Sequence, residues 1–309
     1  MMQQNVRISV LTSLYNCKRY LSGYFEHLAR VLNLEEIEVL LLHNEPKEDE
    51  VRLIEKAIPR FPQHLIQHIE IDQRESLYAS WNRGVRHAQG AFIGVWNVDD
   101  IREPNSLQKQ ADLLTQNPHA GMAYGDMIGV DNYGDKEGRL YTAPEFAGKQ
   151  NLFLRNFYGS CFPMWPKQIH EKVGYFDEQL RVVGDLDFQI RIASQSEMVK
   201  VDSLLGYYLE GDPNKLTRSS NLIVVEGVAI GLRYGIGERV NVLFLPETLT
   251  KIKIKSLFWY GKNELVSSWY KGHRLGIMEY VSFLSKCMIR LPLDVARALK
   301  HCAKSMFHF

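Results

Sequence analysis

The sequence predicts an α/β protein with a doubly wound, mixed but mainly parallel sheet, followed by a helical C-terminal extension. Three observations predict it. Short apolar segments alternate with amphipathic segments over the first hundred residues, the pattern of successive β-α-β units. The segment 37–43 (IEVLLLH) is apolar almost throughout, as in strands buried on both faces. The length, 309 residues, suits one large domain with an extension.

The alternation can be followed element by element. Residues 6–13 (VRISVLTS) have the pattern of a strand, and residues 18–33 carry apolar side chains at helical spacing (Leu21, Phe25, Leu28 and Leu32). The further expected elements, in order, are a strand at 37–43, a helix near 47–57, a strand at 68–72, a helix at 76–89 that Gly90 ends, a strand at 91–96 and a helix at 105–114. Sheets of this kind bind ligands beyond the carboxyl ends of their strands.

Composition limits the class of protein. Apolar and charged residues make up 45% and 24% of the chain, as in ordinary soluble globular proteins. The cysteines are scattered without a CxxC pair, which favours a reducing compartment over a disulfide framework or structural zinc (Cys17, Cys161, Cys287 and Cys302). The N-terminus enters a strand pattern almost at once, and no uninterrupted apolar stretch reaches the length of a spanning helix. We therefore expect a cytoplasmic chain without a signal peptide.

The net charge of +1 is unevenly distributed. Residues 251–309 contain 11 Lys and Arg against 3 acidic residues, 11 − 3 = +8, so the preceding 250 residues carry 1 − 8 = −7. Basic residues there alternate with Trp, Tyr, Phe and Leu, a composition that favours an interfacial amphipathic helix on an anionic membrane over a nucleic-acid arm. A helical cap with a solvated basic face is an equally good interpretation, and we expect no nucleic-acid partner.

A pair of carboxylates, Asp99 and Asp100, directly follows the apolar strand 91–96. The chain has no GxxxxGK[ST] motif, and no GxGxxG follows the first strand, so P-loop, kinase and ordinary dinucleotide-binding functions lose their main support. A divalent cation, Mn²⁺ or Mg²⁺, held by carboxylates and phosphate oxygens would offset the paired charges. On these two residues alone, a solvated turn that caps the next helix is the better interpretation.

Four segments, in the expected order, resemble the inverting nucleotide-diphospho-sugar transferases of the GT-A fold, glycosyltransferase family 2. These segments are VRISVLTSLYNCKRYL (6–21), LYASWNRGVRHAQGAFIGVWNVDD (77–100), GSCFPMWPKQIHEKVGYFDEQL (159–180) and VVGDLDFQIRIA (182–193). Their order and spacing are more specific than any one of them. The resemblance covers about residues 6–195 and does not extend to the tail after about 240.

The resemblance implies sugar transfer with inversion, assisted by a divalent metal. It implies that Asp99 is the main metal ligand with Asp100 in support, and that Asp185 is the general base for the acceptor hydroxyl. Asp185 taken alone is also a common residue at a helix N-terminus. Asp187 and Arg191, four residues apart, are placed on the acceptor side together with Trp165, although a surface ion pair for the first two and a core position for Trp165 remain open.

The resemblance also implies a set of residues that bind the donor nucleotide: Thr12, Tyr15, Asn16, His43, Asn44, Ser76, Asn82, Asn97 and Val98. Ordinary turn chemistry explains the first three equally well. The sequence departs from the family where an Asp-Asp pair would end the second strand, since it has His43 and Asn44, and where Asn97 replaces a first Asp. UDP is the default nucleotide, with a neutral His43 accepting a hydrogen bond from the base.

The expected organisation is a GT-A domain over 1–240, with a donor half at about 1–103 and an acceptor half at about 104–240, and a basic, aromatic-rich extension over 241–309. The expected partners are a nucleotide-sugar donor and a glycan or lipid-linked acceptor of polysaccharide biosynthesis, at the cytoplasmic face of a membrane. Arg74 and Arg83 are candidates for the positive charge that the family carries where this chain has Trp81, and Lys215 and Arg218 are candidate diphosphate contacts. A catalytically silent nucleotide-sugar-binding scaffold stays open, whereas a nucleotidyltransferase would need a glycine-rich first loop that TSLYNCKRY lacks.

Overall fold

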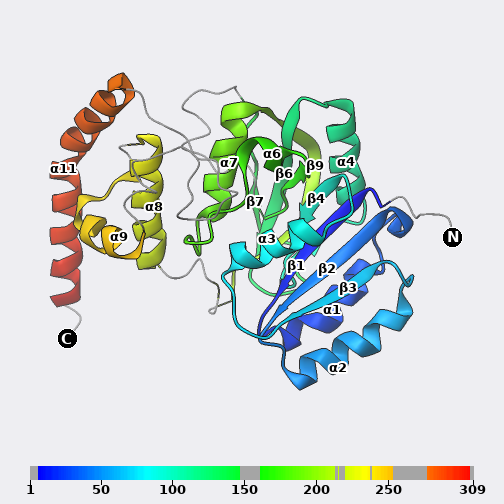
Figure 1. Cartoon of the computed structure of the whole chain (residues 1–309). Helices are drawn as coiled ribbons and strands as arrows, with labels where there is room; N and C mark the ends of the chain where they lie inside the picture. Colours follow the sequence, from blue (N-terminus) through cyan, green and yellow to red (C-terminus); the bar gives the residue numbers. More distant parts are fainter. Residues whose placement is uncertain are drawn as a thin grey trace. The chain divides into compact units, whose positions relative to one another are not determined.

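The computed structural model describes residues 6–146, 161–212, 215, 220–236, 239–252 and 277–306. Figure 1 shows the course of the chain. The chain forms two compact units, one of residues 1–176 and 188–214 and the other of residues 177–187 and 215–309. This division differs from the expected boundary at 240, because the apolar helix α8 (Ser220–Tyr234) groups with the elements that follow it.

The first unit contains the predicted parallel sheet. Its strands lie in the order β3 (Ile66–Ile71), β2 (Ile37–Asn44), β1 (Ile8–Leu14) and β4 (Phe92–Val95), and all three pairings are parallel. All residues of β2 are buried, as its continuous apolar sequence indicates. The carboxyl ends of the four strands therefore meet at one edge of the sheet.

The sheet continues beyond β4 in mixed orientation. The strands β8 (Met164–Pro166), β6 (Ala120–Val130), β9 (Glu197–Leu209) and β5 (Ile101–Arg102) follow in that order, with β7 (Arg139–Tyr141) paired to β6. The pairing of β6 with β9 is parallel, whereas β8 and β5 run antiparallel to their neighbours. The mixed, mainly parallel sheet predicted from the sequence is thus confirmed.

Helices cover both faces of the parallel strands. Figure 1 shows α1 (Lys18–Leu28) and α2 (Glu48–Ala57) on one face of β1–β3 and α3 (Leu77–His87) on the other. The remaining elements of this unit are η1 (Leu34–Glu36), η2 (Ile58–Arg60), α4 (Ser106–Gln116), α6 (Ile169–Val173) and most of α7 (Gly184–Gln195). Gly84 allows α3 to pack closely, because a Cβ there would lie 2.7 Å from the Leu11 side chain.

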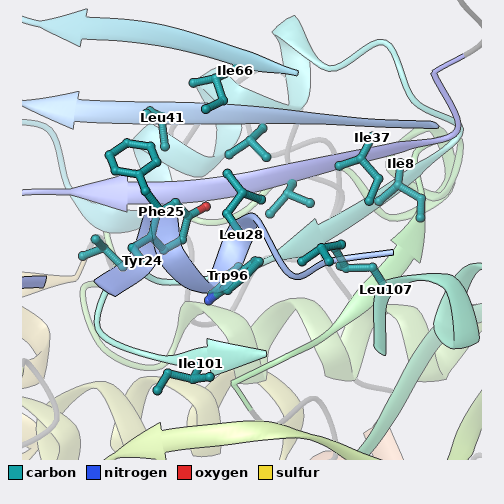
Figure 2. Packing of buried hydrophobic residues seen from close by; sticks show 14 of the residues in the cluster. Ile8, Tyr24, Phe25, Leu28, Ile37, Leu41, Ile66, Trp96, Ile101 and Leu107 are labelled. Carbon is teal, nitrogen blue, oxygen red and sulfur yellow. The ribbon is translucent and has the colours of Figure 1, made fainter. Parts of the chain in front are cut away.

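The core lies between α1 and the sheet. Figure 2 shows Tyr24, Phe25 and Leu28 of α1 against Ile8 and Leu41 of the neighbouring strands. The side chains of β1 alternate, so that Ile8 faces α1 while Leu11 faces α3. Two expected helix ends are corrected. The helix α1 ends at Leu28, which leaves Leu32 at 53% exposure, and α3 ends at His87, three residues before Gly90.

The described residues of the second unit are mainly helical, apart from the irregular segment 177–183 and short connections. This unit contains α8, η5 (Val242–Phe244), α9 (Leu245–Lys251) and the long helix α11 (Ile277–Met306). The basic, aromatic-rich segment 253–276 lies outside the described residues. No helix in the described part of the chain has both the length and the apolar character needed to cross a bilayer.

Candidate active site

An aromatic ring and a guanidinium group form a stacked pair just past the end of β1. The Arg74 guanidinium carbon lies 3.6 Å from the centre of the Tyr15 ring, and Arg74 Nη1 donates to the Tyr15 hydroxyl at 2.9 Å. Tyr15 is 43% exposed and Arg74 is also exposed. This pair offers a flat, cationic surface on which a nucleobase can stack. Arg74 was one of two expected cation candidates, whereas the other, Arg83, pairs with Glu75.

The loop after β1 is held by polar contacts. Asn16 has a positive φ of 48°, a conformation that asparagine tolerates better than most residues, and its side-chain oxygen accepts from Lys47 Nζ at 2.8 Å. Thr12, in contrast, is fully buried, with its hydroxyl 2.7 Å from that of Tyr24. Its expected contact with the nucleotide is therefore corrected to a contact inside the core.

The side chain of His43 lies in the interior at the end of β2. Its Nδ1 is 3.0 Å from Nε2 of His68, and its Nε2 is 3.3 Å from Oε2 of Glu50. Glu50 Oε1 in turn accepts the backbone N–H groups of Cys17 and Lys18 at the start of α1. Both ring nitrogens of His43 are thus engaged within the protein, and the ring has no exposed surface. The expected base-reading role of His43 is corrected to an internal, loop-supporting one.

Burial and hydrogen bonding act in opposite directions on this network. Burial disfavours the charged form of Glu50, but the hydrogen bonds from Cys17, His43 and Lys18 outweigh it and hold the pKa of Glu50 below its usual range. Burial, together with the neighbouring His43, lowers the pKa of His68. A charged Glu50 carboxylate fits the direction of its pKa shift, and it satisfies the N–H groups at the start of α1.

Asn44 and Ser76 organise the start of α3. The Asn44 amide donates to Ser80 Oγ at 2.8 Å and its oxygen accepts the N–H of Glu75 at 2.9 Å. Ser76 is the N-cap of α3, since its hydroxyl accepts the N–H of Ala79 at 3.2 Å. Asn44 is 5% exposed and Ser76 is half-buried. Both side chains shape the edge of the sheet where the Tyr15–Arg74 pair lies.

The acidic pair lies in a tight turn directly after β4. The N–H of Asp100 bonds to the carbonyl of Asn97 at 3.1 Å, and the indole N–H of Trp96 donates to the carbonyl of Asp100 at 2.9 Å. The Asp100 carboxylate accepts from the N–H of Leu209 at 3.2 Å and from the Asn97 amide at 3.3 Å. Asp100 is 1% exposed, whereas Asp99 is half-buried and Val98 is buried. The two adjacent carboxylates therefore have different surroundings.

A third carboxylate, Asp212, lies on the same side of the sheet. Its Oδ2 accepts from the hydroxyl of Tyr20 at 2.8 Å and forms an ion pair with Arg19. Burial, the bond to Asp212 and the nearby charge of Asp99 raise the pKa of Tyr20 to about 12. The N–H of Leu209, the last residue of β9, bonds to the Asp100 carboxylate, so the segment after β9 starts at the acidic turn. Residues 213–214 and 216–219, Arg218 among them, lie outside the described residues.

The acidic turn suits a hard divalent cation. Carboxylate oxygens are the ligands that Mg²⁺ and Mn²⁺ prefer, and such ions commonly take one or two carboxylates and complete their shell with water and phosphate oxygens. Asp99 and Asp100 supply two such carboxylates at the ligand-binding edge of the sheet. Within the described residues, no group of three or more His, Cys, Asp or Glu side chains could hold a metal. A metal here would therefore depend on oxygens of the ligand.

Several expected contact residues lie inside the first unit. The Asn82 side chain accepts from and donates to the backbone of Phe176, at 2.9 and 3.0 Å. The Trp165 indole donates to His170 Nε2 at 2.9 Å, and Arg191 donates to the carbonyl of Tyr175 at 2.8 Å. Asn82 and Trp165 have no exposed surface and Arg191 has 2%. The three side chains bind protein groups inside the first unit, so none of them is carried into the proposed donor or acceptor contacts.

Asp185 and Asp187 open α7 and belong to the second unit. Asp185 is half-buried, and its Oδ1 accepts the N–H of Leu186 at 2.8 Å. Asp187 is fully buried, where it accepts from Arg233 Nη1 at 2.7 Å and from the Tyr234 hydroxyl at 2.6 Å. The surface ion pair considered for Asp187 and Arg191 is excluded, because both side chains are buried. Asp185 is the more accessible of the two carboxylates.

Sequence reasoning missed the residues that anchor these loops: Glu50, Asp212, Glu226 and Arg233. Two of them had a usable signal. Glu226 and Arg233 interrupt the otherwise apolar helix α8, and a charged residue in an apolar helix needs a buried partner. Glu50 gave no such signal, because it stands among charged neighbours in the polar helix α2.

Solved structures with the same fold include two that were solved with a nucleotide sugar. Residues 1–349 of TarS from S. aureus, solved with UDP-GlcNAc, match 96% of this chain and 92% of that one, with a TM-score of 0.60 and 16% identity. The mannosyltransferase PcManGT from Pyrobaculum calidifontis, solved with GDP-Man and Mn²⁺, matches 98% of this chain and 81% of that one, with a TM-score of 0.55 and 11% identity. These likenesses confirm the expected GT-A type of fold.

Sequence relatives point the same way. The uncharacterized glycosyltransferase YwdF of Bacillus subtilis is 24% identical over 201 residues, which cover 63% of this chain and 71% of YwdF. The putative glycosyltransferase EpsE of the same organism is 25% identical over 145 residues, 47% of this chain, and the match spans about half (51%) of EpsE. The family model for glycosyl transferase family 2 matches residues 9–174. Since that match covers more than half of the chain and includes the acidic turn, the chain belongs to glycosyl transferase family 2.

Proposed function

We propose that this chain transfers one hexosyl group, with inversion and with the help of a divalent metal, from a nucleotide-diphosphate sugar to a hydroxyl of a glycan or lipid-linked saccharide. The observation that carries the proposal is the carboxylate pair Asp99 and Asp100 at the end of β4. It lies at the edge of the sheet where β1 ends in the exposed Tyr15–Arg74 pair. The carboxylate pair suits a divalent cation that carries a diphosphate, and the Tyr15–Arg74 pair suits a nucleobase.

The nucleotide is proposed to stack on Tyr15 and Arg74. Asn16 is proposed to contribute from the same loop, and Asn97 and Val98 from the acidic turn. UDP is the proposed nucleotide, as in the TarS complex, although the GDP-mannose of PcManGT shows that the fold also accepts a purine. Because His43 is engaged by His68 and Glu50, selection of the base is assigned to the loop around Tyr15 and Arg74.

Asp99 is proposed as the principal metal ligand and Asp100 as its support. A bound Mn²⁺ or Mg²⁺ would neutralise the negative charge that develops on the departing diphosphate. Asp100 holds the turn against Leu209 and Asn97, which keeps the neighbouring Asp99 carboxylate in place. PcManGT was solved with Mn²⁺, which supports the choice of metal.

Asp185 is proposed as the general base. The acceptor oxygen attacks the anomeric carbon from the side opposite the diphosphate, the bond to the diphosphate breaks, and the hydroxyl proton passes to Asp185. One displacement of this kind inverts the anomeric configuration. The half-buried carboxylate of Asp185 at the first turn of α7 supports the role, because a helix N-terminus stabilises negative charge there.

A thermal-shift panel tests the proposal. UDP-, GDP-, CMP- and dTDP-sugars are added to the full chain and to Asp99→Ala, each with Mn²⁺ or with chelator. We expect one nucleotide class to raise the melting temperature of the native chain only with Mn²⁺, and Asp99→Ala to lose this effect. Stabilisation that is equal with chelator would contradict the metal role. Stabilisation without any transfer to glycan acceptors would favour the silent scaffold instead.

The C-terminal extension is proposed to contact an anionic membrane peripherally, at the cytoplasmic face, where lipid-linked acceptors would be met. The helix α11 exposes large apolar side chains, among them Met278 at 80%, Met288 at 70% and Ile289 at 76%. The charge of +8 over residues 251–309 complements an anionic surface. In flotation with anionic liposomes, the double variant Met288→Asp, Ile289→Asp is expected to stay with the soluble fraction. Unchanged flotation would leave α11 a packing element.

A further inference from the structure

The helix α8 carries two charged residues on one side, Glu226 and Arg233. They are 1% and 0% exposed, and the helix around them is otherwise apolar. They lie seven positions apart in the sequence, which is about two helical turns, so both side chains leave the helix on the same side. Charges buried in this way are tolerated only with close partners.

Glu226 binds three successive backbone N–H groups. Its Oε1 accepts from Arg181 at 2.8 Å, and its Oε2 accepts from Val182 at 2.8 Å and from Val183 at 3.0 Å. These residues directly precede Gly184, the first residue of α7. One carboxylate therefore fixes the backbone from which the helix begins.

Arg233 binds both ends of the same segment. Its Nη2 donates to Asp177 Oδ2 and its Nη1 donates to Asp187 Oδ1, each at 2.7 Å. The Tyr234 hydroxyl donates to the same oxygen of Asp187 at 2.6 Å. Asp177 and Asp187 are both fully buried. The planar guanidinium offers its donors in fixed directions, so two carboxylates held by it keep a defined separation.

We propose that Glu226 and Arg233 are positioning residues for Asp185. They anchor the segment 177–187 at its two ends and at residues 181–183, and Asp185 lies two residues from the nearest anchor on each side. This inference rests on the proposed function, in which Asp185 takes the proton of the acceptor. The contacts of Glu226 and Arg233 explain how Asp185 is held in position, which the residues of the acidic turn and the donor loop do not.

Positioning matters because proton transfer needs the base within hydrogen-bonding distance of the acceptor hydroxyl. A displacement of about 1 Å at a reacting group can reduce the rate about a hundredfold. Asp185 itself is held locally by the N–H of Leu186, so its placement depends on the backbone around it. That backbone is what Glu226 and Arg233 hold.

The test compares four variants of the full chain: Arg233→Met, Arg233→Lys, Tyr234→Phe and Glu226→Gln. Initial rates are measured with the donor that the thermal-shift panel identifies. For Arg233→Met and Glu226→Gln we expect kcat to fall about a hundredfold with the donor KM within twofold of the native value. Arg233→Lys should recover part of kcat, because lysine can still bind one of the two carboxylates. Tyr234→Phe, which removes one hydrogen bond, should lower kcat less than Arg233→Met.

Val228→Ala is the matched control. Val228 is fully buried on the same helix and is an apolar side chain, so this variant weakens the packing of α8 without removing a hydrogen bond of the network. If Val228→Ala lowers kcat as much as Glu226→Gln at a similar loss of melting temperature, the positioning role is overturned. It is also overturned if folded Glu226→Gln and Tyr234→Phe keep native kcat, or if the donor KM rises in proportion to the loss of kcat. If Arg233→Met does not fold, the kcat values of Glu226→Gln and Tyr234→Phe test the positioning role.

Hydrogen exchange separates this inference from the proposed function. The amides of residues 181–183 should exchange faster in Glu226→Gln than in the native chain and in Val228→Ala, whether or not the chain transfers sugar. A native chain without transferase activity, but with this exchange pattern, would contradict the proposed function and leave the anchoring of the segment standing. Unchanged exchange of these amides would overturn the anchoring itself.

Discussion

The imidazole of His43 and the carboxylate of Glu50 lie 3.3 Å apart inside the first unit, at 0% and 1% side-chain exposure. Since Glu50 also accepts the N–H groups of Cys17 and Lys18, this contact joins the end of β2 to the start of α1. The exposed Tyr15 belongs to the loop that ends at this anchor. The contact therefore supports a loop that is proposed to bind the donor.

Replacing Glu50 by glutamine tests this support. Glu50→Gln removes the charge that strengthens the bonds to the two N–H groups, so we expect the free energy of unfolding to fall by about 1–3 kcal/mol. We also expect weaker nucleotide binding, because the loop loses its anchor. Urea denaturation and calorimetry measure the two effects. Glu48→Gln is the control, since Glu48 lies on the same helix, is exposed and pairs with the exposed Arg52. Equal losses in both variants would contradict the anchoring role.

The buried His170 makes stability depend on pH. Burial is the main cause that lowers its pKa to about 4, and Arg191 adds to it, while the bond to Gly174 opposes it. The Trp165 indole donates to Nε2 at 2.9 Å, and Nδ1 lies 3.0 Å from the carbonyl of Gly174, an arrangement that suits the neutral ring. An unfolded histidine has a pKa of about 6.5, so the unfolded chain takes up the proton first as the pH falls.

The stabilisation from neutral His170 is therefore present above about pH 6.5 and is lost progressively as the pH falls toward 4. Between pH 7 and pH 5 this amounts to about 2 kcal/mol for a group with these two pKa values. Urea denaturation of the native chain and of His170→Asn at both pH values measures it. We expect the difference between the two pH values to be smaller in His170→Asn by about this amount. The same difference in both proteins would contradict the assignment to His170.

The stacked pair of Tyr15 and Arg74 predicts a loss of nucleotide affinity on truncation. Stacking of a base on an aromatic ring contributes about 1–3 kcal/mol, so Tyr15→Ala should weaken nucleotide binding about tenfold to a hundredfold. Tyr15→Phe keeps the ring and loses only the hydroxyl that accepts from Arg74, and it should cost less. Calorimetry with the free nucleoside diphosphate measures both. Binding that Tyr15→Ala leaves unchanged would place the nucleobase elsewhere.

The parallel half of the sheet can be predicted from the sequence because short, contiguous residue patterns specify its strands and helices. The strands β1, β2 and β4 are short apolar runs, and the helices between the strands carry amphipathic patterns. The other half depends on pairings between distant segments. The strand β5 has two residues, and β6 pairs with β9 through register shifts, features that no local pattern specifies.

The candidate site likewise has features that local sequence predicts and features that depend on distant contacts. Asp99 and Asp100 are predictable as a pair, because two carboxylates after a buried strand are chemically conspicuous. Their different burial is not, since it depends on the distant Leu209. His43 and Trp165 are residue types that commonly contact ligands, and only the tertiary packing against Glu50 and His170 turns their rings inward. Sequence predicts which chemistry is present, whereas the orientation of each side chain follows from contacts across the fold.

Asp185 and Asp187 provide a matched pair for the last prediction. Both lie in the first turn of α7, but Asp185 is half-buried, whereas Asp187 is buried against Arg233 and Tyr234. Asp185→Asn should leave the free energy of unfolding nearly unchanged and retain donor binding, while kcat falls by two orders of magnitude or more, because the amide cannot take the proton.

Asp187→Asn, in contrast, should lower the free energy of unfolding. It removes one carboxylate from a buried guanidinium, and breaking such a pair typically costs about 3–5 kcal/mol. Urea denaturation, calorimetry with the donor and initial rates separate the two variants, since only Asp185→Asn should combine native stability with lost transfer. Undiminished transfer in Asp185→Asn would remove it as the base. Native stability in Asp187→Asn would show that Arg233 holds the segment through Asp177 alone.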